Sequence, residues 1–200
     1  MIAVIDYDAG NIKSVEKALE YLGAKAKLTR DEKDILNADK VILPGVGAFG
    51  DAMEKLEKYE LTEVIKNVAN SGTPFLGICL GLQLLFENSQ ESPEANGLGI
   101  LKGEILRFPD DMGLKIPQIG WNRLDFPRQG RLFEGLDKPF VYFVHSYYLK
   151  AADEDIVTAT AEYGISFHAS VEAGNVFACQ FHPEKSSSQG LKILENFLKL

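Results

Sequence analysis

The sequence is poor in cysteine and histidine, and it contains neither a long apolar segment nor a run of basic residues. Its 200 residues include two cysteines, three histidines and one tryptophan. No apolar stretch approaches the roughly 20 residues of a transmembrane helix, and the first residues lack the basic region and the length of a signal peptide. We therefore expect a cytoplasmic protein whose thiols are reduced.

Basic residues are outnumbered by acidic ones, 21 to 29, which gives a net charge of −8. This balance argues against nucleic acid and anionic membranes as partners. Hydrophobic residues make up 46% of the chain, enough to bury a proper core, and the length is long for one domain but short for two. We predict a single α/β domain over residues 1–200 whose partner is a small molecule or another protein.

Buried strands and amphipathic helices are predicted in alternation through the first half. Continuous apolar runs indicate strands buried on both faces, and apolar residues at helical spacing indicate the helices between them. The strands are expected at 2–5, 24–28, 40–43 and 73–78, and the helices at 12–22, 31–37, 51–59, 61–70 and 80–87. Such alternation predicts a doubly wound, mostly parallel sheet with ligands at the carboxyl ends of its strands.

The second half is dominated by glycine, proline and short β-like segments. These segments lie at 103–108, 120–126, 140–144, 156–162, 167–172 and 176–181, with a hairpin turn at 173–175 and a closing helix at 188–200. We interpret them as antiparallel additions to the same sheet, within the same domain.

Residues 73–83 run from an apolar strand straight into a helix, with Cys79 at the junction. Gly77 lets the strand end lie close to its surroundings, and Gly81 lets the helix cross the strand. The pattern Gly-x-Cys-x-Gly is the thiol version of a nucleophile elbow. At a helix N-terminus the thiol pKa can fall from ~8.5 to roughly 3.5–7.5, which favours the reactive thiolate. The alternative is that Cys79 is a small buried hydrophobe.

A glycine-rich loop, residues 44–50, follows the third predicted strand. Three glycines in seven residues leave backbone amides bare enough to bind an anion, as in oxyanion sites and phosphate loops. No Gly-Lys-Ser/Thr follows, so a nucleotide loop is not expected. A plain turn is the alternative.

His182 and Glu184 stand two residues apart after the last predicted strand. On an extended segment they point the same way, and Pro183 is expected to keep the segment from becoming helical. The carboxylate could then orient the imidazole, which gives the base and orienter of a catalytic triad. The alternatives are a surface ion pair or half of a metal site. Because no other histidine or cysteine stands at ligand spacing, we predict no metal.

The remaining cysteine and histidines are predicted to be structural. Strand alternation places Cys179 on the opposite face, with Phe177 and Phe181, so we expect it in the core. His145 and His168 lie isolated among aromatic residues.

Seven segments spread from end to end resemble one family. They are Asp6-Tyr7 with Gly10-Asn11, and residues 44–50, 77–83, 97–99, 119–122, 143–147 and 180–186. Residues 44–47, 77–83 and 180–184 look like the class I (triad) glutamine amidotransferases, which have a flavodoxin-like fold. More narrowly, the chain is similar to the glutaminase subunits of imidazole glycerol phosphate synthase in histidine biosynthesis, a match that rests on residues 6–7 with 10–11, 44–50, 97–99, 119–122, 143–147 and 182–186.

This resemblance implies a reaction for the three candidate catalytic residues. Cys79 would attack the carboxamide of L-glutamine, and His182 would take the thiol proton and return it to the departing nitrogen. Ammonia leaves, a glutamyl thioester remains, and water activated by His182 then releases glutamate while Glu184 orients the ring. No cofactor is required.

The resemblance also implies the supporting contacts. Backbone amides of Leu80 and of the peptide between Val46 and Gly47 would stabilise the oxyanion. Glutamine would be held by four polar residues, Gln83, Glu91, Ser146 and Tyr147.

A separate acceptor of ammonia is implied because the chain has no second domain. In the similar enzymes this is a (β/α)8-barrel cyclase subunit, which forms imidazole glycerol phosphate and aminoimidazole carboxamide ribotide; we expect a heterodimer. Asn11, Trp121 and Lys185 match positions that meet the barrel. Otherwise they would be a turn residue, a core aromatic and a solvated charge. We also expect the isolated chain to be nearly inactive, because the oxyanion loop would not present its amide inward.

Three other functions compete. The chain could supply ammonia to an anthranilate, guanylate or purine synthase, although residues 119–122 and 182–186 match the histidine-pathway members better. It could be a thiol hydrolase of similar fold, although in those the histidine typically follows the elbow closely. It could be a binding module that kept the fold, which the intact set of Cys79, His182 and Glu184 disfavours.

Overall fold

Helices and strands alternate in the first half of the computed structural model, which describes residues 1–10 and 12–200. The elements of this half are β1 (Ile2–Ile5), α1 (Ile12–Tyr21), β2 (Ala26–Thr29), α2 (Glu32–Leu36), β3 (Lys40–Gly45), α3 (Phe49–Lys58), α4 (Leu61–Ser71), β4 (Phe75–Cys79) and α5 (Leu80–Leu84). The predicted alternation is confirmed.

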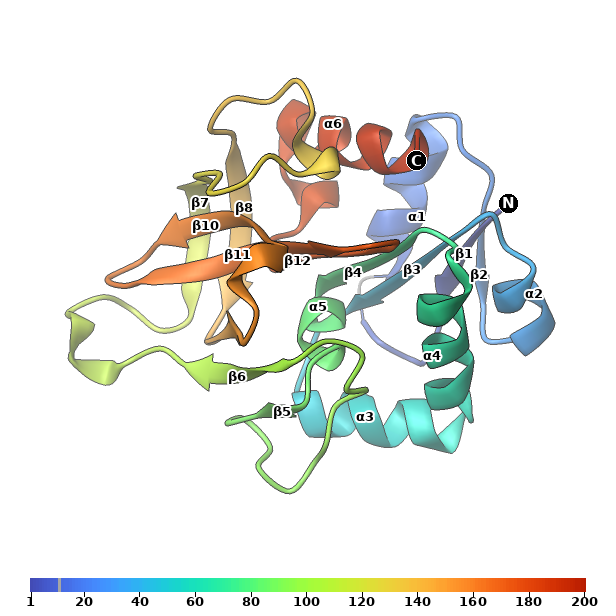
Figure 1. Ribbon diagram of the computed structural model, residues 1–200, viewed down its shortest axis with the longest axis horizontal. Helices are drawn as coiled ribbons and strands as arrows, with labels where there is room; N and C mark the ends of the chain where they lie inside the picture. The colour runs from blue at the N-terminus through green and yellow to red at the C-terminus, as the bar shows by residue number, and fades with distance from the viewer. Residues whose placement is uncertain (11) are drawn as a thin grey trace.

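The second half consists of short strands and single turns of 3-10 helix before one long helix (Figure 1). Its strands are β5 (Asn88–Ser89), β6 (Gly103–Arg107), β7 (Gln118–Arg123), β8 (Phe140–His145), β9 (Tyr147–Ala151), β10 (Val157–Glu162), β11 (Ser166–Ala173) and β12 (Val176–Cys179). Its helical pieces are η1 (Asp110–Met112), η2 (Arg131–Phe133), η3 (Glu154–Ile156), η4 (Pro183–Lys185) and α6 (Ser187–Leu198).

The described strands form one large mixed sheet and one separate ribbon. The sheet has the order β2-β1-β3-β4-β12-β11-β9-β6-β5, with β10 paired to β11. From β2 to β12 all neighbours are parallel, whereas β11 is antiparallel to β12 and β9 is antiparallel to both β11 and β6. The predicted fold class, a mostly parallel sheet with antiparallel additions, is confirmed.

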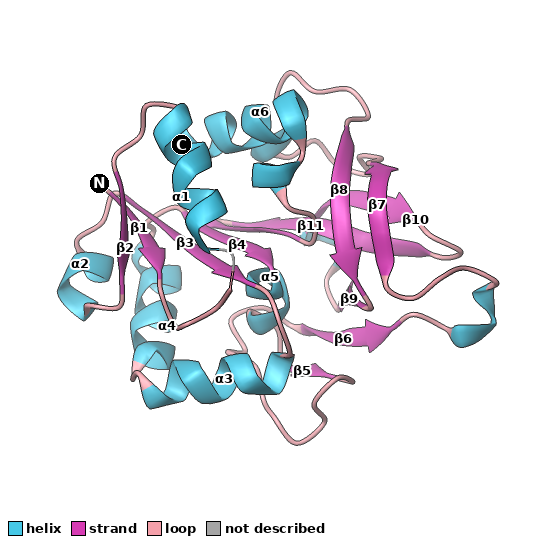
Figure 2. Ribbon diagram, turned by 180° about the vertical axis from the view of Figure 1, so that it is seen from behind, coloured by secondary structure: helices cyan, strands magenta, loops and turns pink. Residues whose placement is uncertain are grey.

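Helices cover both faces of the parallel part, as Figures 1 and 2 show. Helices α3, α4 and α5 pack on one face, against strand residues such as Val41 and Phe75. Helices α1 and α6 pack on the other, against the alternate residues, such as Ile42 and Leu76. Burial on both faces explains why these strands read as continuous apolar runs. None of the described helices is long and apolar enough to cross a bilayer.

Strands β7 and β8 pair antiparallel over six residues each, outside the large sheet. In both views this ribbon runs across the direction of β11. It carries three of the large apolar side chains that stay exposed, Ile119, Trp121 and Phe140, at 63%, 53% and 56%. The sequence-based alternative that Trp121 is a core aromatic is therefore wrong.

Three expectations about local structure are corrected. The segments 120–126 and 140–144 were expected to extend the large sheet, but the corresponding strands β7 and β8 pair with each other in a separate two-stranded sheet. Helix α5 ends at Leu84, not near Glu87, because the carbonyl oxygens of Leu84 and Leu85 accept from the backbone amides of Leu98 and Leu101, at 2.8 and 3.0 Å. Strand β9 was not expected; it pairs with β6 and β11 and connects the ribbon to the sheet.

Candidate active site

The end of β4 meets the start of α5 at Cys79, in a backbone conformation that L residues rarely adopt. Cys79 has φ 55° and ψ −110°. A Cβ on Gly81 would lie 1.8 Å from the carbonyl oxygen of Leu43, and one on Gly77 would lie 2.7 Å from the carbonyl oxygen of Gly81. The predicted need for small residues on both sides of Cys79 is confirmed. Strain of this kind typically occurs at functional sites, where the surrounding packing maintains it.

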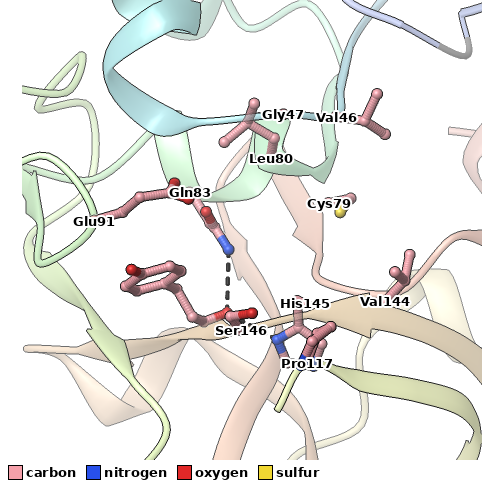
Figure 3. Close-up of a pocket in the computed structure, with 11 residues that line it drawn as sticks. Val46, Gly47, Cys79, Leu80, Gln83, Glu91, Pro117, Val144, His145 and Ser146 are labelled. Atoms are coloured by element: carbon pink, nitrogen blue, oxygen red, sulfur yellow. Dashed lines mark hydrogen bonds between the residues drawn. The ribbon is translucent and has the colours of Figure 1, made fainter.

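Cys79 borders a cavity of about 340 Å³ at the carboxyl ends of the parallel strands. This volume is in the range of small-molecule sites. The lining comes from the loop after β3, the elbow, the β5 region and the β8–β9 connection, as Figure 3 shows. Its residues are Val46, Gly47, Cys79, Leu80, Gln83, Glu91, Pro117, Val144, His145, Ser146 and Tyr147.

His182 and Glu184 form a buried pair directly after β12. The Nδ1 atom of His182 lies 2.8 Å from Oε1 of Glu184, and both side chains are almost fully buried. The segment is not extended as expected: Pro183 begins the 3-10 helix η4, since a proline at the first helical position loses no hydrogen bond. The Ser186 hydroxyl fixes this turn by donating to the carbonyl oxygen of His182 at 2.6 Å.

The imidazole of His182 interacts with the thiol of Cys79. Burial alone would lower its pKa, but hydrogen bonding and charge interactions with Cys79 and Glu184 outweigh burial and raise the pKa to about 10. Within the described residues its Nε2 atom makes no hydrogen bond of ordinary geometry, so Nε2 is available for the proton of Cys79. The three predicted catalytic residues thus lie together, from segments a hundred residues apart.

The predicted oxyanion residues lie on the same cavity. In the register of β3 and β4, Gly45 stands opposite Cys79, so the glycine-rich loop begins beside the elbow. Gly47 has φ 109°, a conformation that favours glycine. Val46, Gly47 and Leu80 all border the cavity, and their backbone amides are candidates for stabilising negative charge there.

All four predicted glutamine-binding residues also border the cavity. Gln83 donates from Nε2 to the carbonyl oxygen of Tyr147 at 3.2 Å and to Oε1 of Gln180 at 3.0 Å. Glu91 accepts from the backbone amide of Phe49 at 2.8 Å, which fixes a carboxylate at the rim. Ser146 lies in the connection between β8 and β9, opposite Gln83 in Figure 3.

A model of the family described as glutamine amidotransferase class-I matches residues 3–200. The chain belongs to this family.

Within the amidotransferases, the chain is similar to proteins named "Imidazole glycerol phosphate synthase subunit HisH". The protein of that name from Moorella thermoacetica is 52% identical over 200 residues, which covers 100% of this chain and 94% of the relative. The one from Aquifex aeolicus is 54% identical over 196 residues, covering 97% and 94%. The similarity therefore extends over essentially the full length of this chain and of each relative.

Solved structures share the amidotransferase fold at lower identity. A crystal structure described as a glutamine amidotransferase has a TM-score of 0.78 and 22% identity, covering 100% of this chain and 98% of the other. The structure of PurLQS from Thermotoga maritima has a TM-score of 0.77 and 24% identity, covering 99% and 97%. These two likenesses support the fold.

The three predicted interface residues have different outcomes in this amidotransferase. Trp121 is exposed on β7, and Lys185 is exposed in η4. Asn11 lies outside the described residues. The interface assignment stays a prediction for all three.

The residues predicted to be structural are held in the core or by backbone contacts. Cys179 is buried and free, and its thiol donates to the carbonyl oxygen of Phe181 at 3.5 Å. His168 accepts from the backbone amide of Ala151 at 3.1 Å. His145 lies closer to the site than expected: it borders the cavity, and its Nδ1 is 2.8 Å from the carbonyl oxygen of Tyr147.

Sequence reasoning missed two polar residues that contact the site. The buried hydroxyl of Tyr7 donates to the carbonyl oxygen of Pro44, the first residue of the glycine-rich loop, at 3.0 Å. Burial, followed by the charge of Cys79, raises the pKa of Tyr7. Gln180 is fully buried and donates to Sγ of Cys79 at 3.7 Å. The sequence signal that could have revealed Gln180 is its position as an amide within the otherwise apolar segment 176–181.

Metal chemistry was not predicted at this site. Among residues 1–10 and 12–200, no group of three His, Cys, Asp or Glu side chains lies close enough together to hold a metal ion.

Proposed function

We propose that this chain is the glutaminase subunit of an imidazole glycerol phosphate synthase, and that it hydrolyses L-glutamine to glutamate and ammonia. One observation carries the proposal: Cys79, in a strained elbow on a cavity of about 340 Å³, interacts with His182, which Glu184 orients at 2.8 Å. The similarity to proteins named as HisH subunits supports the pathway.

The proposed reaction begins with proton transfer from the thiol of Cys79 to Nε2 of His182. The thiolate attacks the carboxamide carbon of glutamine, and the tetrahedral intermediate collapses when His182 returns the proton to the departing nitrogen. Ammonia leaves, and a glutamyl thioester remains on Cys79. Water that loses its proton to His182 then hydrolyses the thioester.

Charge that develops on the substrate oxygen is proposed to be stabilised by the backbone amide of Leu80 and by that of the peptide between Val46 and Gly47. Removing one such donor typically costs a factor of ~10²–10³ in rate. The carboxylate of Glu91 suits the α-ammonium group of glutamine. Gln83, Ser146 and Tyr147 supply polar groups for the rest of the amino-acid end.

The released ammonia needs a protected path, because at neutral pH it is protonated in bulk water and is then a poor nucleophile. We propose that a cyclase subunit with a (β/α)8 barrel docks over the β7–β8 ribbon to form a heterodimer. Ile119 and Trp121 are two apart on β7 and so share a face, and Phe140 stands opposite Arg123 on the same face. Exposed large apolar side chains gathered on one face are typical of protein interfaces. Lys185 is proposed to lie at its edge.

Glutamate release, measured with and without the cyclase, tests the proposal. We expect little activity from the chain alone and strong stimulation in the complex. Trp121→Ala should weaken association with the cyclase by tenfold or more, roughly the effect of losing a hot-spot aromatic. Tyr21→Ala, which removes another exposed aromatic from α1, serves as the control. Full activity without the cyclase would contradict partner dependence, and absence of glutaminase activity in the complex would contradict the function itself. The cytoplasmic location stays a prediction.

A further inference from the structure

Gln180 is a buried amide that the proposed reaction does not use. It follows β12 between Cys179 and Phe181, its exposed fraction is 0%, and its backbone amide donates to the carbonyl oxygen of Ala169 at 2.8 Å. An amide buried among apolar residues is costly unless its polar atoms are bonded. Both ends of this one are bonded, and one partner is the proposed nucleophile.

A chain of hydrogen bonds fixes which end of Gln180 faces the sulfur. The carbonyl oxygen of Tyr147 can only accept, so the group of Gln83 that meets it at 3.2 Å is the NH₂. The second hydrogen of that NH₂ points to Gln180 at 3.0 Å and requires an oxygen there. The NH₂ group of Gln180 therefore faces Sγ of Cys79, at 3.7 Å.

We propose that Gln180 is a catalytic residue for the proposed glutaminase reaction, on which this inference rests: it donates a permanent hydrogen bond to Sγ of Cys79 and so favours the thiolate. A neutral amide cannot take the thiol proton, so it does not compete with His182. In the activation step the S–H bond breaks, its electron pair stays on sulfur, and the proton forms a bond to Nε2 of His182. A hydrogen bond to the charged form of a group stabilises that form.

The other titratable groups around the sulfur have different tasks. The hydroxyl of Tyr7 donates its hydrogen bond to the carbonyl oxygen of Pro44, and His182 is the proposed acceptor of the thiol proton of Cys79. Among the residues that the structure describes, the remaining titratable groups near the sulfur or on its cavity are Cys179, Glu184, Glu91, His145 and Tyr147. None of these is a neutral, permanent donor to Cys79, which is the role that Gln180 fills.

Two substitutions separate donation to sulfur from support of Gln83. Gln180→Glu keeps an oxygen for Gln83 but places a carboxylate against the sulfur. Gln180→Leu removes both hydrogen bonds at similar volume. Asn196→Leu is the matched control, because Asn196 is also a buried amide whose Nδ2 donates twice, to the carbonyl oxygens of Leu132 and Glu134 in a different part of the fold.

The measurement is the rate of alkylation of Cys79 by iodoacetamide as a function of pH, with the modified peptide identified by mass spectrometry, in the assembled complex. We expect the midpoint of the pH profile to rise by about one unit in Gln180→Leu and by about two in Gln180→Glu, with kcat/KM for glutamine falling about tenfold or more at neutral pH. Asn196→Leu should keep the wild-type midpoint, even if it unfolds at a lower temperature.

A purely structural role predicts a different result. If Gln180→Glu folds and shows the wild-type midpoint, or if both variants lose kcat while the alkylation profile stays in place, the proposal is overturned. Failure of the proposed function itself is recognised separately: the wild-type complex would then release no glutamate from glutamine, or Cys79→Ala would release it as fast as the wild type, whatever Gln180 does. Should Gln180→Leu fail to fold, Gln180→Glu alone decides, since its size matches that of glutamine.

Discussion

The two cysteines lie on neighbouring strands, almost side by side, and have opposite characters. In the register of β4 and β12, Cys179 stands opposite Ile78, one residue before Cys79. Cys179 ends β12 without a left-handed φ and lies in the core with Phe177 and Phe181, where burial raises its pKa. Cys79 has a left-handed φ, borders a cavity and interacts with His182.

The difference between these two regions shows what turns a buried thiol into a candidate nucleophile. Residue type and depth are nearly the same for both cysteines. What differs is the backbone, which only at Cys79 has a left-handed φ and passes directly into a helix, and the neighbours, which include a proton acceptor and an amide donor only at Cys79. Substitutions that affect one region should therefore leave the other largely unchanged.

The largest expected effect is that of Cys79→Ala on glutamate release. Without the nucleophile no thioester can form, so the rate should fall by a factor of about 10⁴ or more, whereas synthesis driven by added ammonia should continue in the complex. Assays of both activities on the same preparation check this. Retention of glutaminase activity would remove Cys79 from the mechanism.

The next effect concerns the carboxylate behind His182. Glu184→Gln keeps the volume but loses the charge that orients the ring and helps to raise its pKa to about 10. We expect kcat to fall about 10²- to 10⁴-fold, as is typical of a triad that loses its orienting carboxylate. Glu195→Gln, in an exposed ion pair with Lys192, is the control. Equal kcat values for the two variants would exclude orientation by Glu184.

A third substitution tests the backbone of the elbow. A Cβ at Gly81 would overlap the carbonyl oxygen of Leu43, at 1.8 Å, so Gly81→Ala should lower the free energy of unfolding by about 3 kcal/mol or more. Gly174→Ala, where φ is 60° but no atom lies within 4 Å, should cost only about 1–2 kcal/mol. Urea unfolding compares them. A smaller cost at Gly81 would mean that the turn can relax.

His145 and His182 should make opposite contributions to the pH dependence of stability, because their pKa values are shifted in opposite directions. Burial, opposed by a hydrogen bond to the carbonyl oxygen of Tyr147, lowers the pKa of His145 to about 4. Between pH 6.5 and 4 the unfolded chain therefore binds the extra proton, and stability should fall by about 1.4 kcal/mol per pH unit. The raised pKa of His182 gives a contribution that is complete below pH 6.5 and is lost as pH rises to about 10.

Urea unfolding at a series of pH values measures how the free energy of unfolding depends on pH. His145→Gln should reduce the loss of stability between pH 6.5 and 4 (the acid limb). His182→Gln should leave that loss in place and change the pH dependence above pH 6.5. An acid limb of unchanged slope in His145→Gln would show that His145 is not the group that titrates.

The smallest effect is expected at the second cysteine. Cys179→Ala should change kcat less than about twofold and cost about 1–2 kcal/mol of stability, because it removes one buried sulfur and leaves a small cavity. Steady-state kinetics and thermal unfolding check this. A large loss of activity with little loss of stability would contradict the assignment of Cys179 to the core and not to the reaction.

The parts of the fold that follow from local signals could be predicted from sequence. The apolar runs of β1, β3 and β4 predict buried strands from local sequence alone. The glycines around Cys79 predict a sharp turn in the same way. The short α5 and the strand β9 could not be predicted, because they depend on hydrogen bonds to distant segments. The contact of Gln180 with Cys79 was hidden for the same reason: it exists only because β12 pairs with β4.

Mapping the covalent bond formed with glutamine tests the central claim most directly. The complex is treated with an electrophilic glutamine analogue, digested, and the modified residue is identified by mass spectrometry. The account predicts modification of Cys79 alone, blocked by excess glutamine and absent in Cys79→Ala. Modification of Cys179 or of any other residue, with Cys79 left unmodified and activity lost, would contradict it.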